Sequence, residues 1–86
     1  MNQIQTLDSI RPGERAVVEK LNISGNMRRR FLDIGLIENT TVECLGRSPG
    51  GDPSAYFIRG AVIAIRAQDS RGVQIRQSAA EGGSWA

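Results

Sequence analysis

The sequence predicts a mostly β fold, a small antiparallel barrel of about five strands with one short helix inserted after the first strand. Its 86 residues are enough for one domain. Short stretches of alternating apolar and polar residues recur along the chain, which is typical of strands. Ten glycines and three prolines indicate many turns between them. These features favour a barrel of the SH3-like or OB type, with one domain at residues 1–78 and a flexible C-terminal tail at residues 79–86.

Residues 15–21 form the first predicted strand. Pro12-Gly13 supplies a turn just before it. Alternation along the strand places Ala16 and Val18 on one face and Leu21 on the opposite face. The first strand is therefore expected to have a partly covered second face.

A helix of two to three turns is predicted after this strand. Its apolar stripe, with spacing i, i+4 and i+7, consists of Met27, Phe31 and Ile34. Ser24 or Asn26 can serve as the N-cap residue. Gly35 can take a positive φ just beyond the helix, and Leu36 can then pack back on Phe31 in a Schellman motif.

The next strand is predicted at residues 40–47, where β-branched residues and alternation occur together. Its buried face carries Val42 and Cys44. The segment that follows, residues 48–53, contains two prolines and two glycines, which cannot continue a strand. We therefore expect a loop there.

A hairpin and a short closing strand complete the predicted barrel. The hairpin joins residues 56–58 to residues 62–65, with Gly60 as the first central residue of a two-residue type II′ turn. A turn at residues 68–72 then leads to the closing strand at residues 73–76.

The residue types present exclude the common kinds of catalytic and metal sites. The chain has no histidine, so neither histidine-activated nucleophiles nor imidazole ligands are available. Its single cysteine, Cys44, cannot form an internal disulfide and is expected to be buried as a small hydrophobic residue. We therefore expect no enzyme activity, no cofactor and no metal site.

The sequence also predicts a cytoplasmic protein that does not insert into the membrane itself. No apolar stretch approaches the length that crosses a bilayer. Residues 1–10 lack the basic start and the apolar core of a secretory leader. A single cysteine suits a reducing compartment.

Arg28 and Arg29 are the first candidate for partner binding. With Arg30 they form a run of three, although the net charge of the chain is only +2. Helical spacing turns Arg28 and Arg29 away from the apolar stripe. They form either a solvated helix face, with Asp33 within reach of Arg29, or a surface for an acidic partner.

The second candidate is the loop of Pro49, Gly50, Gly51, Asp52 and Pro53. A phosphate-binding loop would need a Gly-Lys-Ser/Thr end and a helix directly after it, and the sequence has neither. A plain connection between strands is the simpler interpretation, and contact with a partner is the alternative.

Single-stranded nucleic acid is a third, weaker alternative. The hairpin carries Tyr56, Phe57, Arg59 and Arg66, which could stack on bases and neutralise phosphates. Aromatic residues make up only 5% of the chain, so a small barrel needs them in its core. Nucleic-acid binding is therefore disfavoured.

Three segments resemble successive signatures of one known family. They read Arg-Arg-Phe-Leu-Asp-Ile-Gly-Leu at 29–36, Pro-Gly-Gly-Asp-Pro at 49–53 and Arg-Gly-Ala-Val-Ile-Ala-Ile-Arg at 59–66. In this order and spacing, the chain resembles the ferrous-iron transport protein A family over residues 6–76. Members commonly carry a Pro-Gly turn where this chain has Glu38-Asn39-Thr40, and Asn39 can supply the positive φ.

The resemblance implies an SH3-like barrel in the bacterial cytoplasm with an accessory, non-enzymatic role. The implied partner is the cytoplasmic region of a large membrane GTPase that transports ferrous iron, which the accessory protein would modulate. A similar SH3-like domain forms the C-terminal part of iron-dependent repressors, so a detached regulatory module or a small nucleic-acid-binding barrel is the alternative. The lack of a helix-turn-helix segment weighs against that alternative.

Overall fold

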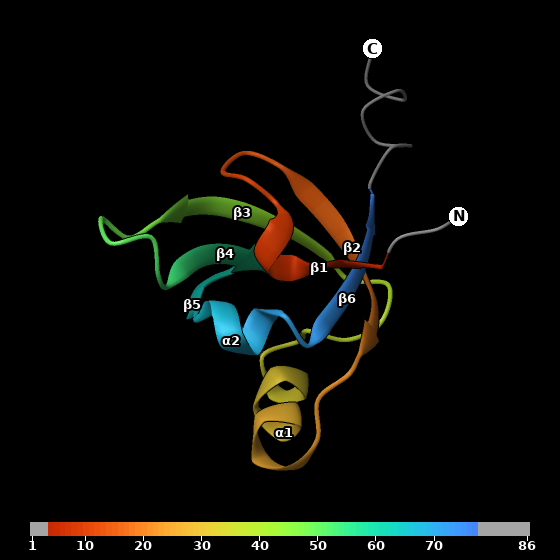
Figure 1. Ribbon diagram of the computed structural model, residues 1–86. Helices are drawn as coiled ribbons and strands as arrows, with labels where there is room; N and C mark the ends of the chain where they lie inside the picture. Colours follow the sequence, from red (N-terminus) through yellow and green to blue (C-terminus); the bar gives the residue numbers. More distant parts are fainter. Residues whose placement is uncertain (1–3, 78–86) are drawn as a thin grey trace.

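Six antiparallel strands in one sheet dominate the structure, a computed structural model that describes residues 4–77 (Figure 1). The strands are β1 (Gln5–Thr6), β2 (Arg15–Leu21), β3 (Thr41–Arg47), β4 (Ser54–Ile58), β5 (Ala61–Ile65) and β6 (Val73–Gln77). Their order across the sheet is β1-β6-β2-β3-β4-β5. The helical segments of the described residues are η1 (Leu7–Ser9), α1 (Gly25–Asp33) and α2 (Ala67–Ser70). The predicted mostly β fold is confirmed, and the predicted tail at residues 79–86 lies outside the described residues.

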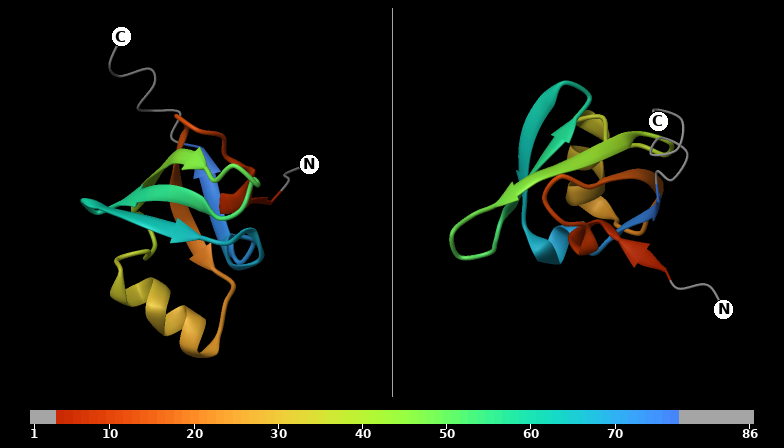
Figure 2. Two further views of the ribbon diagram at one scale, coloured as in Figure 1. Left: turned by 90° about the vertical axis from the view of Figure 1, so that its left-hand side faces the viewer. Right: turned by 90° about the horizontal axis from the view of Figure 1, so that it is seen from above.

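The sheet curls around one hydrophobic core, and α1 lies against one side of it (Figure 1, Figure 2). The largest side chains of this core include Tyr56, Leu7 and Leu36. They come from β4, from η1 and from the segment after α1, so strands and connections fill the barrel together. Cys44 is fully buried and free, as the alternation of its strand predicted.

β2 contains an irregularity that changes which of its side chains reach the core. Its register on β6 shifts between Val18 and Lys20. An extra residue in a strand reverses the alternation beyond it. As a result Leu21 joins Ala16 and Val18 in the core. The prediction that Leu21 lies on the opposite face is wrong, because the bulge depends on the pairing with β6.

The C-terminus of α1 has the predicted Schellman geometry. The Gly35 N–H donates to the carbonyl oxygen of Leu32 at 3.0 Å, and the Leu36 N–H donates to that of Phe31 at 2.8 Å. Gly35 has a φ of 92°, which glycine adopts without steric cost. At the other end Ser24 is the N-cap residue, without a side-chain capping hydrogen bond. The predicted helix and its end are confirmed.

Replacement of Gly35 by alanine is expected to lower the free energy of unfolding by about 1–2 kcal/mol. The positive φ is strained for alanine, and the added Cβ would collide with Cδ of Arg59. Gly50→Ala is the matched control, because no atom lies within 4 Å of its Cβ position and its φ is not positive. Urea denaturation of both variants tests this, and equal stabilities would contradict it.

β4 and β5 form the predicted hairpin with a different turn. Ile58 pairs with Ala61, so Arg59 and Gly60 are the central residues. Their φ values are 49° and 88°, and two positive values mark a type I′ turn. The predicted type II′ turn with Gly60 in first position is wrong, because the two-residue turn lies one residue earlier in the chain, at Arg59-Gly60, and Ala61 already pairs with Ile58.

The turn between α1 and β3 uses Asn39 as the sequence suggested. Asn39 has a φ of 73°, and its N–H donates to the carbonyl oxygen of Val18 at 2.7 Å. The Val18 N–H donates to the carbonyl oxygen of Thr40 at 2.9 Å. These two bonds hold the turn against β2.

β1 and α2 are elements that the sequence did not predict. β1 pairs with β6 through Gln5–Ile75 and Thr6–Gln74, which extends the sheet beyond the five expected strands. α2 lies where only a turn at residues 68–72 was expected. The Arg66 carbonyl oxygen accepts hydrogen bonds from two N–H groups of this helix.

Candidate functional site

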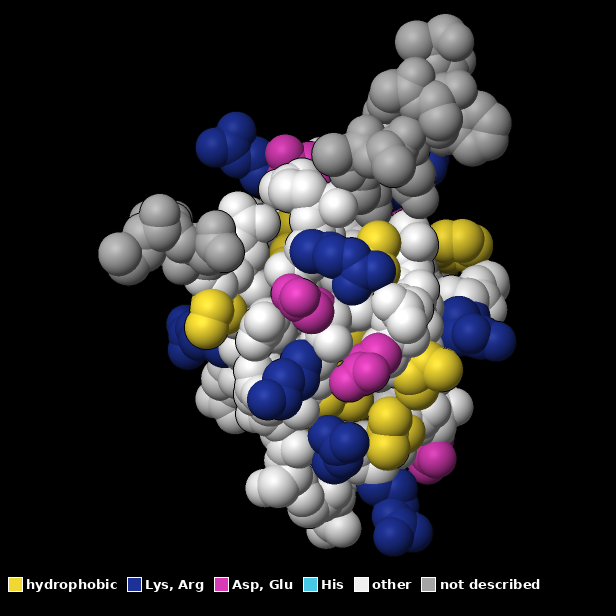
Figure 3. Space-filling model, turned by 90° about the vertical axis from the view of Figure 1, so that its right-hand side faces the viewer, with side chains coloured by type: hydrophobic (Ala, Val, Ile, Leu, Met, Phe, Trp, Pro, Cys, Tyr) yellow, Lys and Arg dark blue, Asp and Glu magenta, His cyan; other side chains and the backbone are white. Residues whose placement is uncertain are grey.

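One exposed face of α1 combines arginines with apolar side chains. Arg28 and Arg29 are exposed, as helical spacing predicted. Beside them lie Leu32 of α1 and Ile37 of the following turn, which are 40% and 41% exposed. Figure 3 shows basic and hydrophobic side chains next to one another in the lower part of this view, where α1 lies. We call these four residues the arginine face.

A shallow hollow of about 550 Å³ joins the arginine face to β2. It is lined by Lys20, Leu21, Arg28, Leu32, Ile37, Glu38 and Asn39. The apolar side chains can contact a partner, while two cations against one carboxylate favour an acidic surface. Apolar contact combined with arginine is typical of protein interfaces.

The two arginines are held in different ways. Nη1 of Arg28 donates to the carbonyl oxygen of Leu21 at 3.3 Å, which ties this side chain to the end of β2. The side chain of Arg29 forms no hydrogen bond or ion pair with another residue in the range 4–77, Asp33 included. All guanidinium donors of Arg29 are therefore available to a partner.

The loop of residues 49–53 joins β3 to β4 and lies away from α1 (Figure 1). Oδ1 of Asp52 accepts a hydrogen bond from the Ala67 N–H at 2.9 Å, so Asp52 caps the first turn of α2. The Gly51 N–H donates to the carbonyl oxygen of Ser48 at 2.7 Å. The structure does not bring the two predicted surfaces together, and it gives Asp52 a structural contact.

Of the seven residues that line the hollow, sequence reasoning named only Arg28 as a partner-binding candidate. A signal existed for Leu32, because an apolar side chain one position beyond Phe31 falls outside the buried stripe. Lys20 and Ile37 come from other segments, so their place beside α1 depends on the contact between the Asn39 turn and β2. No local pattern predicts that contact.

The side chains of this surface can bind by ion pairs, hydrogen bonds and apolar contact. Within residues 4–77, no three His, Cys, Asp or Glu side chains gather as a metal site would need. Burial raises the pKa of the Cys44 thiol, which lowers its thiolate fraction and its nucleophilicity. In the same described part of the chain, none of the helices has the length and apolar character to span a membrane.

The family model and the similar solved structures point to the same protein family. The model of the FeoA domain matches residues 5–77, and no curated protein matches the chain. A FeoA protein from Chlorobium tepidum is 26% identical, with a TM-score of 0.81 over 86% of this chain and 70% of that one. A zinc complex of FeoA from Stenotrophomonas maltophilia, described as a prokaryotic SH3 domain protein, is 22% identical, with a TM-score of 0.71 over 84% and 89%. The predicted SH3-like fold is confirmed.

The same barrel also occurs within a larger regulator. A manganese-dependent transcriptional repressor is 17% identical, with a TM-score of 0.76 over 88% of this chain. The match covers 42% of the repressor chain. This likeness shows a shared fold.

Proposed function

We propose that this chain, which belongs to the FeoA domain family, is a non-enzymatic accessory protein of bacterial ferrous iron uptake. The family is related to ferrous iron transport, and its Stenotrophomonas maltophilia member is described as a candidate activating factor of that transport. In this proposal the chain acts in the cytoplasm. It binds the cytoplasmic region of a membrane GTPase iron transporter and modulates the transporter.

The observation that supports this proposal best is the combination of exposed apolar side chains and arginines on the arginine face. Leu32 and Ile37 expose apolar surface whose removal from water favours docking. Arg28 and Arg29 flank this surface, and a guanidinium can form two parallel hydrogen bonds with one carboxylate. The complementary surface on the transporter is therefore apolar with an acidic rim. The loop of Pro49, Gly50, Gly51, Asp52 and Pro53 is the alternative docking surface.

Reversal of both charges, Arg28→Glu with Arg29→Glu, is expected to weaken binding to the purified cytoplasmic region of the transporter at least about tenfold. The new carboxylates would repel an acidic rim, while the buried side of α1 keeps its packing. The effect should be larger at low salt than at physiological salt, because exposed charges are screened. Calorimetric titration at both salt concentrations measures it, with melting curves to confirm folding.

Matched single variants distinguish the effect of a charge on the arginine face from the effect of the net charge of the chain. Arg29→Glu and Arg11→Glu change the net charge equally, and both side chains are exposed and form no ion pair with another described residue. Arg29→Glu is expected to weaken binding and Arg11→Glu is not. A folded double variant that binds like the parent would exclude the arginine face and leave the loop of residues 49–53.

A detached regulatory module is the second candidate, favoured by the structural likeness to the manganese-dependent repressor. Its nucleic-acid form, a small nucleic-acid-binding barrel, would give oligonucleotide binding that falls steeply with salt. Tyr56 is 1% exposed and so unavailable for stacking, whereas Phe57 is 42% exposed. Titration of a labelled oligonucleotide at two salt concentrations tests this candidate, and the absence of binding would exclude its nucleic-acid form.

A further inference from the structure

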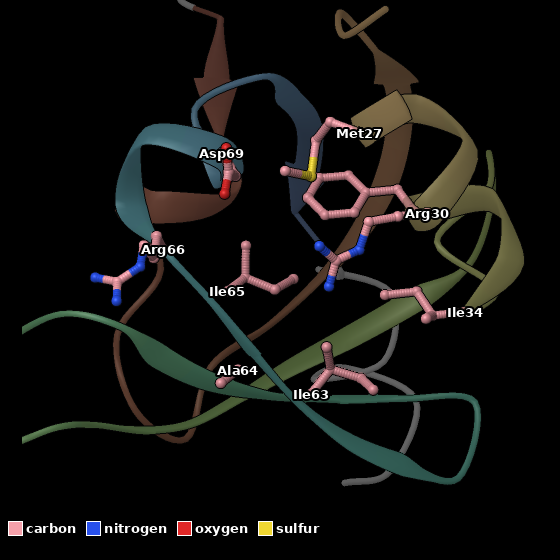
Figure 4. Close-up of a pocket in the computed structure, with 9 residues that line it drawn as sticks. Met27, Arg30, Ile34, Ile63, Ala64, Ile65, Arg66 and Asp69 are labelled. Atoms are coloured by element: carbon pink, nitrogen blue, oxygen red, sulfur yellow. The ribbon is translucent and has the colours of Figure 1, made fainter. Parts of the chain in front are cut away.

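A groove of about 220 Å³ separates α1 from strand β5. Met27 of α1, Ile34 at the C-terminal end of α1 and Ile63 of β5 line this groove (Figure 4). These three side chains are only partly buried, although they pack against the core. The volume lies below the range of about 300–1,000 Å³ that is usual for small-molecule sites. It suits an apolar side chain of a peptide better than a cofactor.

β5 borders this groove as an edge strand with unpaired backbone groups. Within residues 4–77 it pairs only with β4. The pair Ile58–Ala61 closes the two-residue turn and is hydrogen-bonded, so alternate pairs along the hairpin are hydrogen-bonded as well. Val62 and Ala64 fall between those pairs and turn their N–H and C=O groups away from β4. Both residues are exposed, so a further strand could pair with them.

A strand added to β5 would also place side chains in the groove. Residues that lie opposite each other on neighbouring strands point to the same face of a sheet. Ile63 lines the groove, so the residue opposite Ile63 would enter it between Met27 and Ile34. Backbone pairing and the apolar groove would thus act on the same extended segment.

The charges around the groove favour an acidic occupant. Arg30 extends from α1 over the groove, and Arg66 lies at the end of β5 (Figure 4). Neither forms an ion pair with another described residue. Asp69 is the one acidic side chain among the lining residues. The guanidinium groups can therefore pair with carboxylates of a ligand.

The same charges disfavour a second copy of this chain as the occupant. Arg59 and Arg66 flank β5 at its two ends. Antiparallel pairing of two β5 strands would bring Arg59 of one copy near Arg66 of the other, and parallel pairing would bring like arginines together. Like charges on paired strands are destabilising. The occupant is better sought in another protein.

We propose that this groove binds an extended, acidic segment of a partner protein as an additional strand. The segment pairs with the backbone of Val62 and Ala64, inserts an apolar side chain beside Ile63, and places carboxylates near Arg30 and Arg66. The groove lies on a different side of α1 from the arginine face. The inference goes beyond the proposed function and stands whether or not the transporter is the partner.

The probe is a synthetic peptide, acetyl-Glu-Thr-Val-Thr-Val-Thr-Val-Glu-amide, added to the isotope-labelled full chain. We expect saturable shifts of the amide signals of Val62 and Ala64, and hydrogen exchange at both amides slowed at least about tenfold. The matched peptide with lysine in place of both glutamates is expected to produce neither effect. Shifts that are absent, that lie away from β5, or that the lysine peptide reproduces would overturn the proposal.

Two variants locate the peptide on the protein. Val62→Pro removes an outward N–H and leaves the pairing with β4 intact, so it should abolish the shift of the Ala64 amide signal, which this variant retains. Arg30→Gln should weaken peptide binding several-fold, whereas Arg29→Gln, on the arginine face, should not. Equal binding by the Arg30 and Arg29 variants would contradict the proposed charge contact, and this comparison holds even where Val62→Pro fails to fold. Transporter binding is measured separately, so a failure there concerns only the proposed function.

Discussion

Phe31→Ala is expected to lower the free energy of unfolding by about 3–5 kcal/mol. Phe31 is the buried residue of α1, at 5% exposed. Its ring packs in the core cluster with Leu36, while Met27 and Ile34 are only partly buried. Truncation would remove the main attachment of α1 and leave a cavity behind. Because a small domain is stable by only about 5–15 kcal/mol, this is a large share of the total.

Leu32→Ala is the matched control for this prediction. Leu32 lies next to Phe31 in α1 but is 40% exposed, so its truncation should cost less than about 1 kcal/mol. Urea denaturation followed by circular dichroism compares both variants with the parent. Similar losses for the two variants would show that Phe31 does not anchor the helix.

The features that the sequence predicted correctly depend on short stretches of chain. The end of α1 involves residues only a few positions apart, from Phe31 to Leu36, and the hydrogen bonds follow the motif. Cys44 is buried because its strand keeps regular alternation up to that point, with the register shift only beyond it. Local propensity and periodicity are sufficient for such features.

The features that it missed depend on distant partners. Leu21 reaches the core because β2 shifts its register on β6, which is distant in sequence. The first turn of α2 is capped by Asp52, fifteen residues earlier. β1 is two residues long and exists through its pairing with β6. In each case the deciding contact is absent from the local sequence.

The candidate surfaces were likewise predictable only where they depend on local sequence and not on distant contacts. Helical spacing predicted that Arg28 and Arg29 are exposed, because that depends on α1 alone. The hollow beside them also needs Lys20 and Ile37, which the Asn39 turn places next to the helix. The groove needs β5 at the edge of the sheet, and strand order follows from the whole topology.

Stability is expected to fall at alkaline pH, because two buried groups resist ionisation. Burial raises the pKa of the Tyr56 phenol above its ordinary value of 10.0 and that of the Cys44 thiol above 9.0. The exposed fractions of the two side chains are 1% and 0%. In the unfolded chain each group loses its proton near its ordinary pKa, whereas the folded chain retains it to higher pH. Their contribution is therefore fully present below the ordinary values and is lost as the pH rises toward the raised ones.

Tyr56→Phe separates the two groups, since the variant keeps the ring and loses only the hydroxyl with its 3.4 Å hydrogen bond to the Leu7 carbonyl oxygen. Each group can lower the free energy of unfolding by at most about 1.4 kcal/mol per pH unit within its range. Urea denaturation from neutral pH to about pH 11 should show two successive declines in the parent, the thiol acting first because its ordinary pKa is lower. The variant should keep the decline due to Cys44 and lose the steeper part above the ordinary pKa of tyrosine. Parallel curves for parent and variant would mean that the Tyr56 phenol ionises as easily in the folded barrel as in the unfolded chain.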